Sequence, residues 1–388
     1  MRTIDPGRMP TDEQTLILKA TLLEGPAGRE AALRWLPTAS LDRLGTSTRR
    51  LLPLLYDRLQ AEGIDHPMVA VLKGVKRHTW YHNRLLFHQA RDVVRSLRQT
   101  GCEVMIIKGA ALTIEYYRDY GLRPMDDLDL MVPVGKAVEA VAEMQKRGCS
   151  LHWQISLDFM RDHVVDFLWE LHLCNAKGRH FDLHWHLYPM CVNHDSDDDV
   201  WQASRAARFE GEDVRVLCPA DFLLHTIVHG FSWETISPIR WIPDALAILR
   251  NAESIDWERL LQQSVKRGLV AMALPSLAYL QREFAAPVPS EVISTLKNTR
   301  ISLFQKLEYA NGIKPSTSFG DVVVSHLCRT ARVARGASLR KKLRILTLSH
   351  LAYAKFNSRA EIPRRFYAAL RRTIGRRVAS DAEGARAR

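Results

Sequence analysis

Residues 123–132 read RPMDDLDLMV, and this stretch carries the strongest fold signal in the chain. Side chains alternate along a β-strand, so the stretch predicts a strand that turns Asp127 and Asp129 to one face and the intervening leucines to the other. Two carboxylates on one face of an otherwise apolar strand repel each other and lose hydration. A divalent cation such as Mg²⁺, which prefers oxygen ligands, offsets that cost. The stretch therefore predicts a strand that carries a metal site.

A second strand is predicted upstream. Residues 103–107 (EVMII) form a short apolar, β-branched run, and Lys108-Gly109-Ala110 closes it before a helical segment. A glycine at this turn lets the backbone approach a phosphate, toward which the amides at the start of the helix point. Lys108 adds a positive charge. We therefore expect Lys108, Gly109 and Ala110 to bind the phosphates of a nucleotide.

A third acidic residue fits the same site. Residues 180–187 (HFDLHWHL) alternate, so the phenylalanine, leucine and tryptophan side chains face a core and the polar side chains face the opposite way. Asp182 then completes a site of three carboxylates. Such a site holds one or two Mg²⁺ ions, which bridge the phosphates of a nucleoside triphosphate and activate an attacking oxygen for in-line displacement.

The histidines of this strand have two interpretations. His180, His184 and His186 could join Asp182 in binding zinc or another transition metal, because imidazole suits these ions. The protein would then be a metal-dependent hydrolase. In the interpretation that we favour, His184 orients Asp182 or a phosphate, and the other two histidines are solvated at the strand ends.

Other candidate residues flank the strands. Asp126 is expected to be a turn residue, and Arg123 either clamps a phosphate or pairs with Asp126 or Asp127. His225 and His229 lie four residues apart on a predicted helix, without the glutamate of a HExxH metalloprotease. They either pack in and around the core of the site or contact the nucleotide.

The pattern along the chain predicts an α+β protein: a small mixed sheet flanked by helices. Strand-like alternation continues after the second strand, and a turn at residues 175–178 predicts a hairpin. From Pro219 onward only helices are predicted. Two further strands are predicted at residues 149–158 and 164–173. The chain is predicted to consist of a helical amino-terminal part (1–100), an α/β core (101–190), a helical carboxy-terminal domain (191–328) and a basic tail (329–388) that is helical or partly disordered.

Composition narrows the function classes. The 388 residues are 46% apolar, enough for a sizeable core, and six widely spaced cysteines without a CxxC pair exclude a zinc ribbon and a dense disulfide framework. No run reaches the roughly 18 apolar residues of a membrane helix, and the amino-terminal residues do not read as a signal peptide. The expected location is the cytoplasm, with reduced thiols.

The net charge of +12 comes from the tail. Residues 329–388 carry 17 Lys or Arg and three acidic residues, whereas residues 1–328 carry 38 basic and 40 acidic residues. Leu339, Leu343 and Leu346 have helical spacing, which predicts a cationic amphipathic helix. This helix either packs on the body with a solvated face or contacts a polyanion such as nucleic acid or an anionic membrane surface.

Several segments together resemble the bacterial nucleotidyltransferase family proteins, an uncharacterised group within the polymerase-beta-type superfamily. The resemblance spans about residues 40–250 and rests on these segments: IIKGAAL (106–112), GLRPMDDLDLMV (121–132), FDLHWHL (181–187), LLHTIVHG (223–230) and IRWIPDALAIL (239–249). It implies that Asp127, Asp129 and Asp182 bind metal and that Lys108-Gly109 forms the phosphate loop. Arg240 and Asp244 match recurrent positions, where an Arg–Asp pair that fixes helix packing is expected.

The resemblance implies an Mg²⁺-dependent enzyme that transfers a nucleoside monophosphate from ATP or another NTP to a small-molecule, RNA or protein acceptor, with release of pyrophosphate. This chain has Gly109-Ala110 where the superfamily has Gly-Ser or Gly-Gly, and its distance from Gly109 to Asp127 is longer than in the shortest members. The loop therefore lacks a hydroxyl group for the phosphate. The alternative is a nucleotide-binding regulatory module with little turnover, like a component of a toxin–antitoxin pair.

Overall fold

The computed structural model describes residues 10–152, 155–166, 168–231 and 239–303, together with residues 305, 306, 309 and 331. Residues 153 and 154 of the predicted strand 149–158 and the predicted amphipathic helix of the basic tail lie outside the described residues.

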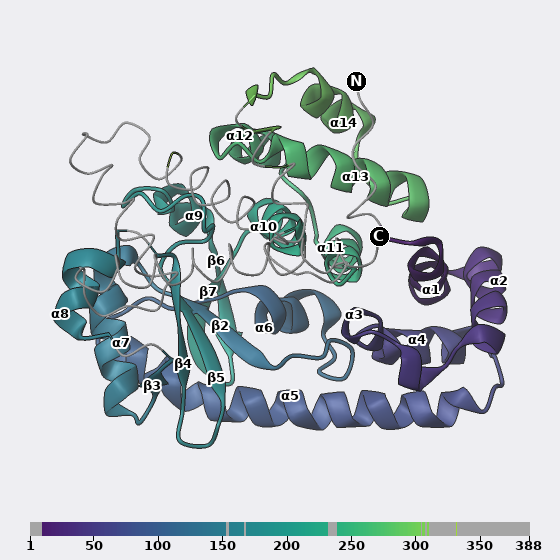
Figure 1. Cartoon of the computed structure of the whole chain (residues 1–388), viewed down its shortest axis with the longest axis horizontal. Coiled ribbons are helices and arrows are strands. Elements are labelled where there is room, and N and C mark those ends of the chain that lie inside the picture. The colour runs from purple at the N-terminus through teal and green to yellow at the C-terminus, as the bar shows by residue number, and fades with distance from the viewer. Residues whose placement is uncertain are drawn as a thin grey trace, which may run out of the picture.

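A seven-stranded mixed sheet lies at the centre of the fold (Figure 1). Its strand order is β3-β4-β5-β2-β1-β7-β6; β2 pairs with β5 and β1 with β7 in parallel, and the other neighbours are antiparallel. The strands are β1 (Met105–Ile106), β2 (Asp127–Met131), β3 (Ser150–Leu151), β4 (Glu170–Cys174), β5 (His180–His184), β6 (Arg205–Phe209) and β7 (Glu212–Val216). The predicted mixed sheet flanked by helices is confirmed.

Alternation along β2 and β5 separates core from site as predicted. Leu128, Leu130, Phe181 and Leu183 are fully buried. In the parallel ladder Asp129 lies opposite Asp182, so the acidic faces of the two strands coincide. Asp182 is in turn opposite His172 of β4. Three adjacent strands thus present polar side chains to one side of the sheet.

Part of the predicted strand structure is wrong. Residues 157–164 include the end of the predicted strand 149–158, the segment between the two predicted strands and the first residue of the predicted strand 164–173. They form α8 (Leu157–Phe159) and a π-helical turn, η6 (Met160–Val164). Ser156 explains the start of α8, because its hydroxyl accepts a hydrogen bond from the Phe159 amide and so caps the helix. The predicted hairpin between β4 and β5 is confirmed.

The sequence analysis missed the hairpin formed by β6 and β7. Phe209 pairs with Glu212, so the connecting loop is Glu210-Gly211, and both loop residues have positive φ (48° and 90°). Two positive φ values define the tight hairpin turn that matches the twist of paired strands. This hairpin extends the sheet past residue 190.

Helices cover the sheet and continue on both sides of it (Figure 1). The 32-residue α5 is the longest, and it runs along the sheet with Leu86, Phe87 and Ala90 buried. The helices before and within the sheet region are α1 (Asp12–Leu22), α2 (Gly25–Trp35), η2 (Leu36–Thr38), η3 (Leu41–Arg43), α3 (Thr46–Arg49), α4 (Leu52–Ala61), α5 (Met68–Gln99), α6 (Lys108–Leu112), η4 (Thr113–Tyr117), η5 (Val134–Lys136), α7 (Ala137–Lys146) and α9 (Asp198–Ala203).

The helices after the sheet contact those that precede it. Lys19 Nζ of α1 lies 2.8 Å from Glu283 Oε2 of α13, and Arg250 Nη1 donates a hydrogen bond to the Leu22 carbonyl. None of the described helices is long and apolar enough to cross a bilayer. The helices after the sheet are α10 (Pro219–Phe231), α11 (Trp241–Asn251), α12 (Trp257–Lys266), α13 (Val270–Phe284) and α14 (Ser290–Asn298).

Candidate active site

The predicted site residues gather on the polar face of the three strands. Strand β2 supplies Asp127 and Asp129, and β5 supplies Asp182 and His184. Asp129 and Asp182 are opposite each other in the ladder, and both are buried. The structure therefore places the three carboxylates that the sequence analysis singled out along one cavity, with Asp129 and Asp182 within one candidate metal group and Asp127 outside it.

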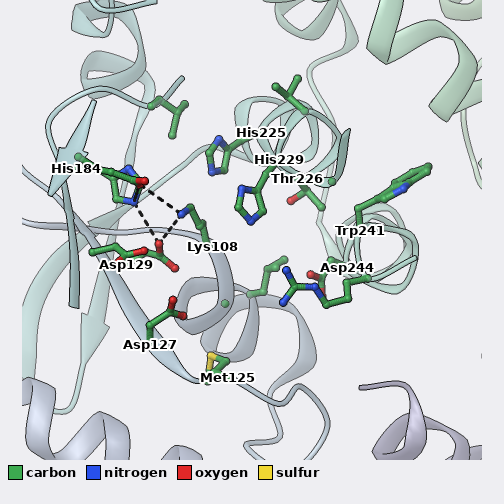
Figure 2. Close-up of a pocket in the computed structure, with 18 of the residues that line it drawn as sticks. Lys108, Met125, Asp127, Asp129, His184, His225, Thr226, His229, Trp241 and Asp244 are labelled. Atoms are coloured by element: carbon green, nitrogen blue, oxygen red, sulfur yellow. Dashed lines mark hydrogen bonds and ion pairs between the residues drawn. The ribbon is translucent and has the colours of Figure 1, made fainter. Parts of the chain in front are cut away.

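Lys108 reaches this cluster from the end of β1 (Figure 2). Its Nζ atom lies 2.6 Å from Asp129 Oδ1 and 3.9 Å from Glu170 Oε2. Burial lowers the pKa of Lys108, but the charges of Asp129 and Glu170 outweigh it and raise the pKa above its ordinary value. Lys108 is therefore a charged group in contact with a predicted metal ligand.

Glu170 and His172 of β4 belong to the cluster but were not identified from the sequence. His172 Nδ1 lies 2.5 Å from Asp182 Oδ1. His184 Nε2 lies 3.0 Å from Glu170 Oε2 and 3.2 Å from Asp129 Oδ1. Of the two roles expected for His184, the structure does not show the contact with Asp182: His172 contacts Asp182, and His184 joins Asp129 to Glu170. A contact of His184 with a phosphate stays a prediction. The alternation of Glu170 and His172 was visible, but their role depends on the pairing of β4 with β5.

Three carboxylates of the cluster differ in their electrostatic surroundings. Burial and the charges of Asp129 and Asp182 raise the pKa of Asp127 to about 6, against the opposing effect of Lys108. Burial would also raise the pKa of Asp129, but Lys108 and His184 lower it well below its usual value. Burial raises the pKa of Glu170, and the charge of His184 outweighs it, so the pKa falls to about 2.

His184 is the cationic partner in this arrangement. Burial and the nearby Lys108 lower its pKa, but Glu170 and Asp129 outweigh them and raise it to about 9. The hydrogen bond to Asp182 raises the pKa of His172, whose side chain is half exposed. Protein cations therefore neutralise much of the negative charge, and Asp127 is the carboxylate that is destabilised by its neighbours.

The donor atoms suit a divalent cation. One group comprises Asp129, Asp182 and His184 and a second comprises Glu170, His172 and Asp182, with all ligand atoms of a group within 4.8 Å of one another. Asp182 belongs to both groups. These mixed oxygen and nitrogen donors can hold Mg²⁺, Mn²⁺ or Zn²⁺.

The alternative zinc site, built from four residues of one strand, is not assembled. His180 is exposed at the start of β5, and His186 lies beyond the end of that strand. His186 is buried, with Nδ1 2.9 Å from Asp197 Oδ2. The expectation that His186 is solvated is therefore wrong, whereas His180 is exposed as expected.

Arg123 pairs with neither Asp126 nor Asp127. Its Nε and Nη2 atoms donate to the Asp244 carboxylate of α11 at 3.0–3.1 Å, and Tyr117 donates to the same carboxylate at 2.9 Å. Asp126 instead pairs with Arg50. An Arg–Asp pair that fixes helix packing was expected between Arg240 and Asp244. In the structure Arg123 donates to Asp244.

Gly109 has a packing role in addition to the phosphate-binding role predicted for it. A Cβ atom at this position would lie 2.2 Å from Arg123 Nη1 and 2.8 Å from Met125 Sδ. Ala110, the next residue, is buried in α6. The glycine therefore allows the Arg123 guanidinium to lie under the start of α6.

A cavity of about 510 Å³ opens above these residues (Figure 2). Its charged side is formed by the carboxylate cluster with Lys108, Arg50, Arg123 and Arg240. Opposite Lys108, α10 contributes His225, Thr226 and His229, and α11 contributes Trp241. The cavity is of the size that holds a substrate or cofactor.

A cavity that joins paired carboxylates on adjacent strands to a lysine–glycine turn is typical of enzymes that act on phosphate groups. The chain belongs to the family described as "Uncharacterised nucleotidyltransferase", whose profile matches residues 46–285. Among solved structures, the chain is similar to an antigenic nucleotidyltransferase-like protein from Paracoccidioides brasiliensis, with 15% identity, a TM-score of 0.34, and coverage of 61% of this chain and 96% of that one. No curated protein matches the sequence.

Proposed function

We propose that the protein is a metal-dependent nucleotidyltransferase that transfers a nucleoside monophosphate from an NTP to an acceptor and releases pyrophosphate. The observation that carries this proposal is the parallel pairing of β2 with β5, which puts Asp129 beside Asp182 at the base of the cavity. Membership of a nucleotidyltransferase family supports it. A polymerase-beta-type ancestry, a bacterial source and a cytoplasmic location remain predictions.

The residues fit a bound Mg²⁺ or Mn²⁺. Asp127, Asp129 and Asp182 offer carboxylate oxygens, and the raised pKa of Asp127 reflects burial and the repulsion that a cation would relieve. Such an ion, when bound, neutralises the phosphate charges and polarises the reacting phosphoryl group.

The basic residues of the cavity would bind the triphosphate. Lys108 is buried and lies at the boundary between the carboxylates and the open cavity. When the carboxylates hold a cation, the Lys108 ammonium group would turn from Asp129 to phosphate oxygens. Arg50, on the same side of the cavity, would neutralise charge at its outer end.

Asp182 and His172 would handle the acceptor proton. The acceptor oxygen attacks the α-phosphorus, and the bond to the oxygen that bridges the α- and β-phosphates breaks, so pyrophosphate leaves with that electron pair. The acceptor proton passes to Asp182. His172, 2.5 Å from Asp182 and half exposed, orients the carboxylate and passes the proton to solvent.

Pyrophosphate release tests the proposal. We would incubate each of the four NTPs with Mg²⁺ or Mn²⁺ and cell extract as a pool of small-molecule, RNA and protein acceptors. The variants are the double substitution Asp127→Asn with Asp129→Asn, and Asp213→Asn on β7 as an exposed control. We expect release by wild type and control and its loss in the double variant.

Two outcomes would contradict the proposal. NTP binding by wild type without pyrophosphate release would identify a nucleotide-binding regulatory protein. Release that persists at the wild-type rate in the double variant would locate the reaction elsewhere.

A further inference from the structure

The wall of the cavity opposite the carboxylates has no part in the reaction above. It is formed by one turn and a half of α10, and Figure 2 shows its histidines on the far side of Lys108 from Asp127. The α10 residues that line the cavity are His225, Thr226, Val228, His229 and Gly230. None of these five carries a formal charge when the imidazoles are neutral, so this wall differs in chemistry from the charged strands.

His225 is a buried polar group in this wall. The residue is 4% exposed, and neither ring nitrogen has a hydrogen-bond partner within the part of the chain that the structure describes. Burial, with the neighbouring His229 ring and the positive charge of Lys108, holds the pKa of His225 well below its usual value. A buried donor or acceptor without a partner costs about 1–3 kcal/mol. A ligand that offers polar atoms would recover that cost.

His229 presents its ring to the cavity. It is exposed, whereas the preceding turn of α10 is buried. Its ring stacks on His225, with centroids 6.0 Å apart and planes 20° apart, and Tyr188 packs edge-to-face with His225, with centroids 5.5 Å apart. The result is a supported, flat, uncharged surface that is open to a ligand.

The neighbouring helix holds this surface in place. A Cβ atom on Gly230 would lie 2.3 Å from the Trp241 Cβ atom, so the glycine allows α10 and α11 to pack closely. Trp241 is buried in this contact. The position of the His225–His229 pair is therefore determined by helix packing.

We infer that the His225–His229 surface of α10 binds the nucleobase of the NTP. This inference rests on the proposed function, which assigns the charged side of the cavity to the metal and the triphosphate. The nucleobase is the flat, uncharged part of an NTP, and it stacks on aromatic rings. Its edge offers both donors and acceptors, which an imidazole can match.

Separate ligands isolate this contact. We would measure by calorimetry the affinities of the four NTPs and of inorganic tripolyphosphate, each with Mg²⁺, for wild type, His229→Ala and His225→Phe. His88→Ala is the matched control, because His88 is an exposed histidine of α5 that does not line the cavity. Circular dichroism and thermal unfolding would establish that each variant is folded.

We expect His229→Ala to weaken NTP binding at least tenfold, about the effect of losing one base-stacking contact. Tripolyphosphate affinity should stay within twofold of wild type. His225→Phe keeps a ring but removes both nitrogens, so it should reduce the differences in affinity among the four NTPs. His88→Ala should leave all affinities unchanged.

The results separate the inference from the proposed function. If wild type binds neither NTP nor tripolyphosphate, the proposed function fails and the inference fails with it. If wild type binds NTPs and His229→Ala binds them equally well, only the inference is overturned. The inference would also be overturned if His229→Ala lost NTP and tripolyphosphate affinity equally. The same holds if the only effect of His229→Ala were a changed KM for the acceptor.

Discussion

Lys108 has an unusual backbone conformation for a residue that carries a side chain. Its φ of 49° lies in the left-handed region that favours glycine, at the junction between β1 and α6. This conformation accompanies a buried ammonium group 2.6 Å from Asp129. The Lys108 ammonium group therefore takes the position beside Asp129 that a bound metal ion would take.

Replacing this ammonium group should favour metal binding. We expect Lys108→Met to bind Mn²⁺ about tenfold more tightly than wild type without nucleotide, equivalent to about 1.4 kcal/mol, because no lysine then competes for Asp129. The same variant should lose NTP affinity. Calorimetric titration with MnCl₂ measures the first effect, and Lys73→Met, at an exposed position of α5, is the control. Unchanged or weaker Mn²⁺ binding would show that Lys108 does not compete.

A methyl group at Gly109 tests the packing beneath the loop. Because its Cβ atom would lie 2.2 Å from Arg123 Nη1, we expect Gly109→Ala to lower the free energy of unfolding by about 1–3 kcal/mol. Urea unfolding measures this quantity. Gly135→Ala is the matched control, since no atom lies within 4 Å of a Cβ built there. Equal stabilities of the two variants would mean that Arg123 moves aside without cost.

For individual residues, the sequence predicted which side chains face the site better than it predicted which side chains they contact. Alternation along β2 and β5 identified Asp127, Asp129 and Asp182, because side-chain direction in a strand is a local property. The partner of His184 was predicted wrongly, and Glu170 was missed. Both depend on which strand lies next to β5, a tertiary property that the alternation of a single strand does not contain.

Among the elements, α11 is tied to the site through one buried carboxylate. Asp244 accepts hydrogen bonds from the Tyr117 hydroxyl group, at the end of η4, and from the Arg123 guanidinium, in the loop between η4 and β2. Burial and the nearby Asp244 raise the pKa of Tyr117 well above its usual value, so the hydroxyl is protonated and donates. A helix far along the chain thereby fixes the loop that leads into β2.

Removing parts of this contact should have graded effects. We expect Asp244→Ala to lose about 3–5 kcal/mol of stability, because it leaves the Arg123 charge buried and unpaired. Tyr117→Phe removes one hydrogen bond and should lose about 1 kcal/mol. Denaturant unfolding of Tyr117→Phe, Asp244→Ala, Arg123→Ala and the double variant Arg123→Ala with Asp244→Ala measures the coupling between Arg123 and Asp244. A double variant as unstable as the sum of the single ones would contradict a direct interaction.

Two elements show where local patterns mislead. Strand-like alternation predicts a strand that continues to residue 158, yet the hydroxyl cap of Ser156 starts a helical turn at Leu157. Conversely, the β6–β7 hairpin has a Glu-Gly turn rather than the Asn-Gly or Asp-Gly that marks such turns most clearly. Capping and turn geometry, rather than hydrophobic periodicity, determined both outcomes.

For the molecule as a whole, helices from the two ends of the described chain contact each other through Lys19, Glu283, Arg250 and Leu22. The buried apolar side chains of these helices and of the sheet form one cluster. We therefore expect global unfolding to report on buried groups at the site.

Acid unfolding should reveal the neutral His225. Its pKa is lower in the folded protein than the ordinary 6.5, so the stability that it contributes is present above pH 6.5 and is lost as the pH falls. Between pH 6 and 5 the loss approaches about 1.4 kcal/mol per pH unit. The His225→Phe variant should not show this loss of stability between pH 6 and 5. Urea unfolding at pH 7, 6 and 5 compares the slopes, and parallel slopes would show that His225 is not neutral when folded.

The division of the cavity between strands and helix has an evolutionary consequence. The groups assigned to the metal and the phosphates lie on β2, β4 and β5, at the start of α6 and between α3 and α4, whereas the His225–His229 surface lies on α10, and no residue belongs to both. Substitutions in α10 can therefore change which nucleotide is chosen while the chemistry is inherited intact. Relatives should accordingly diverge fastest along the helix, so that one ancestral catalyst gives rise to a series of enzymes with different donors.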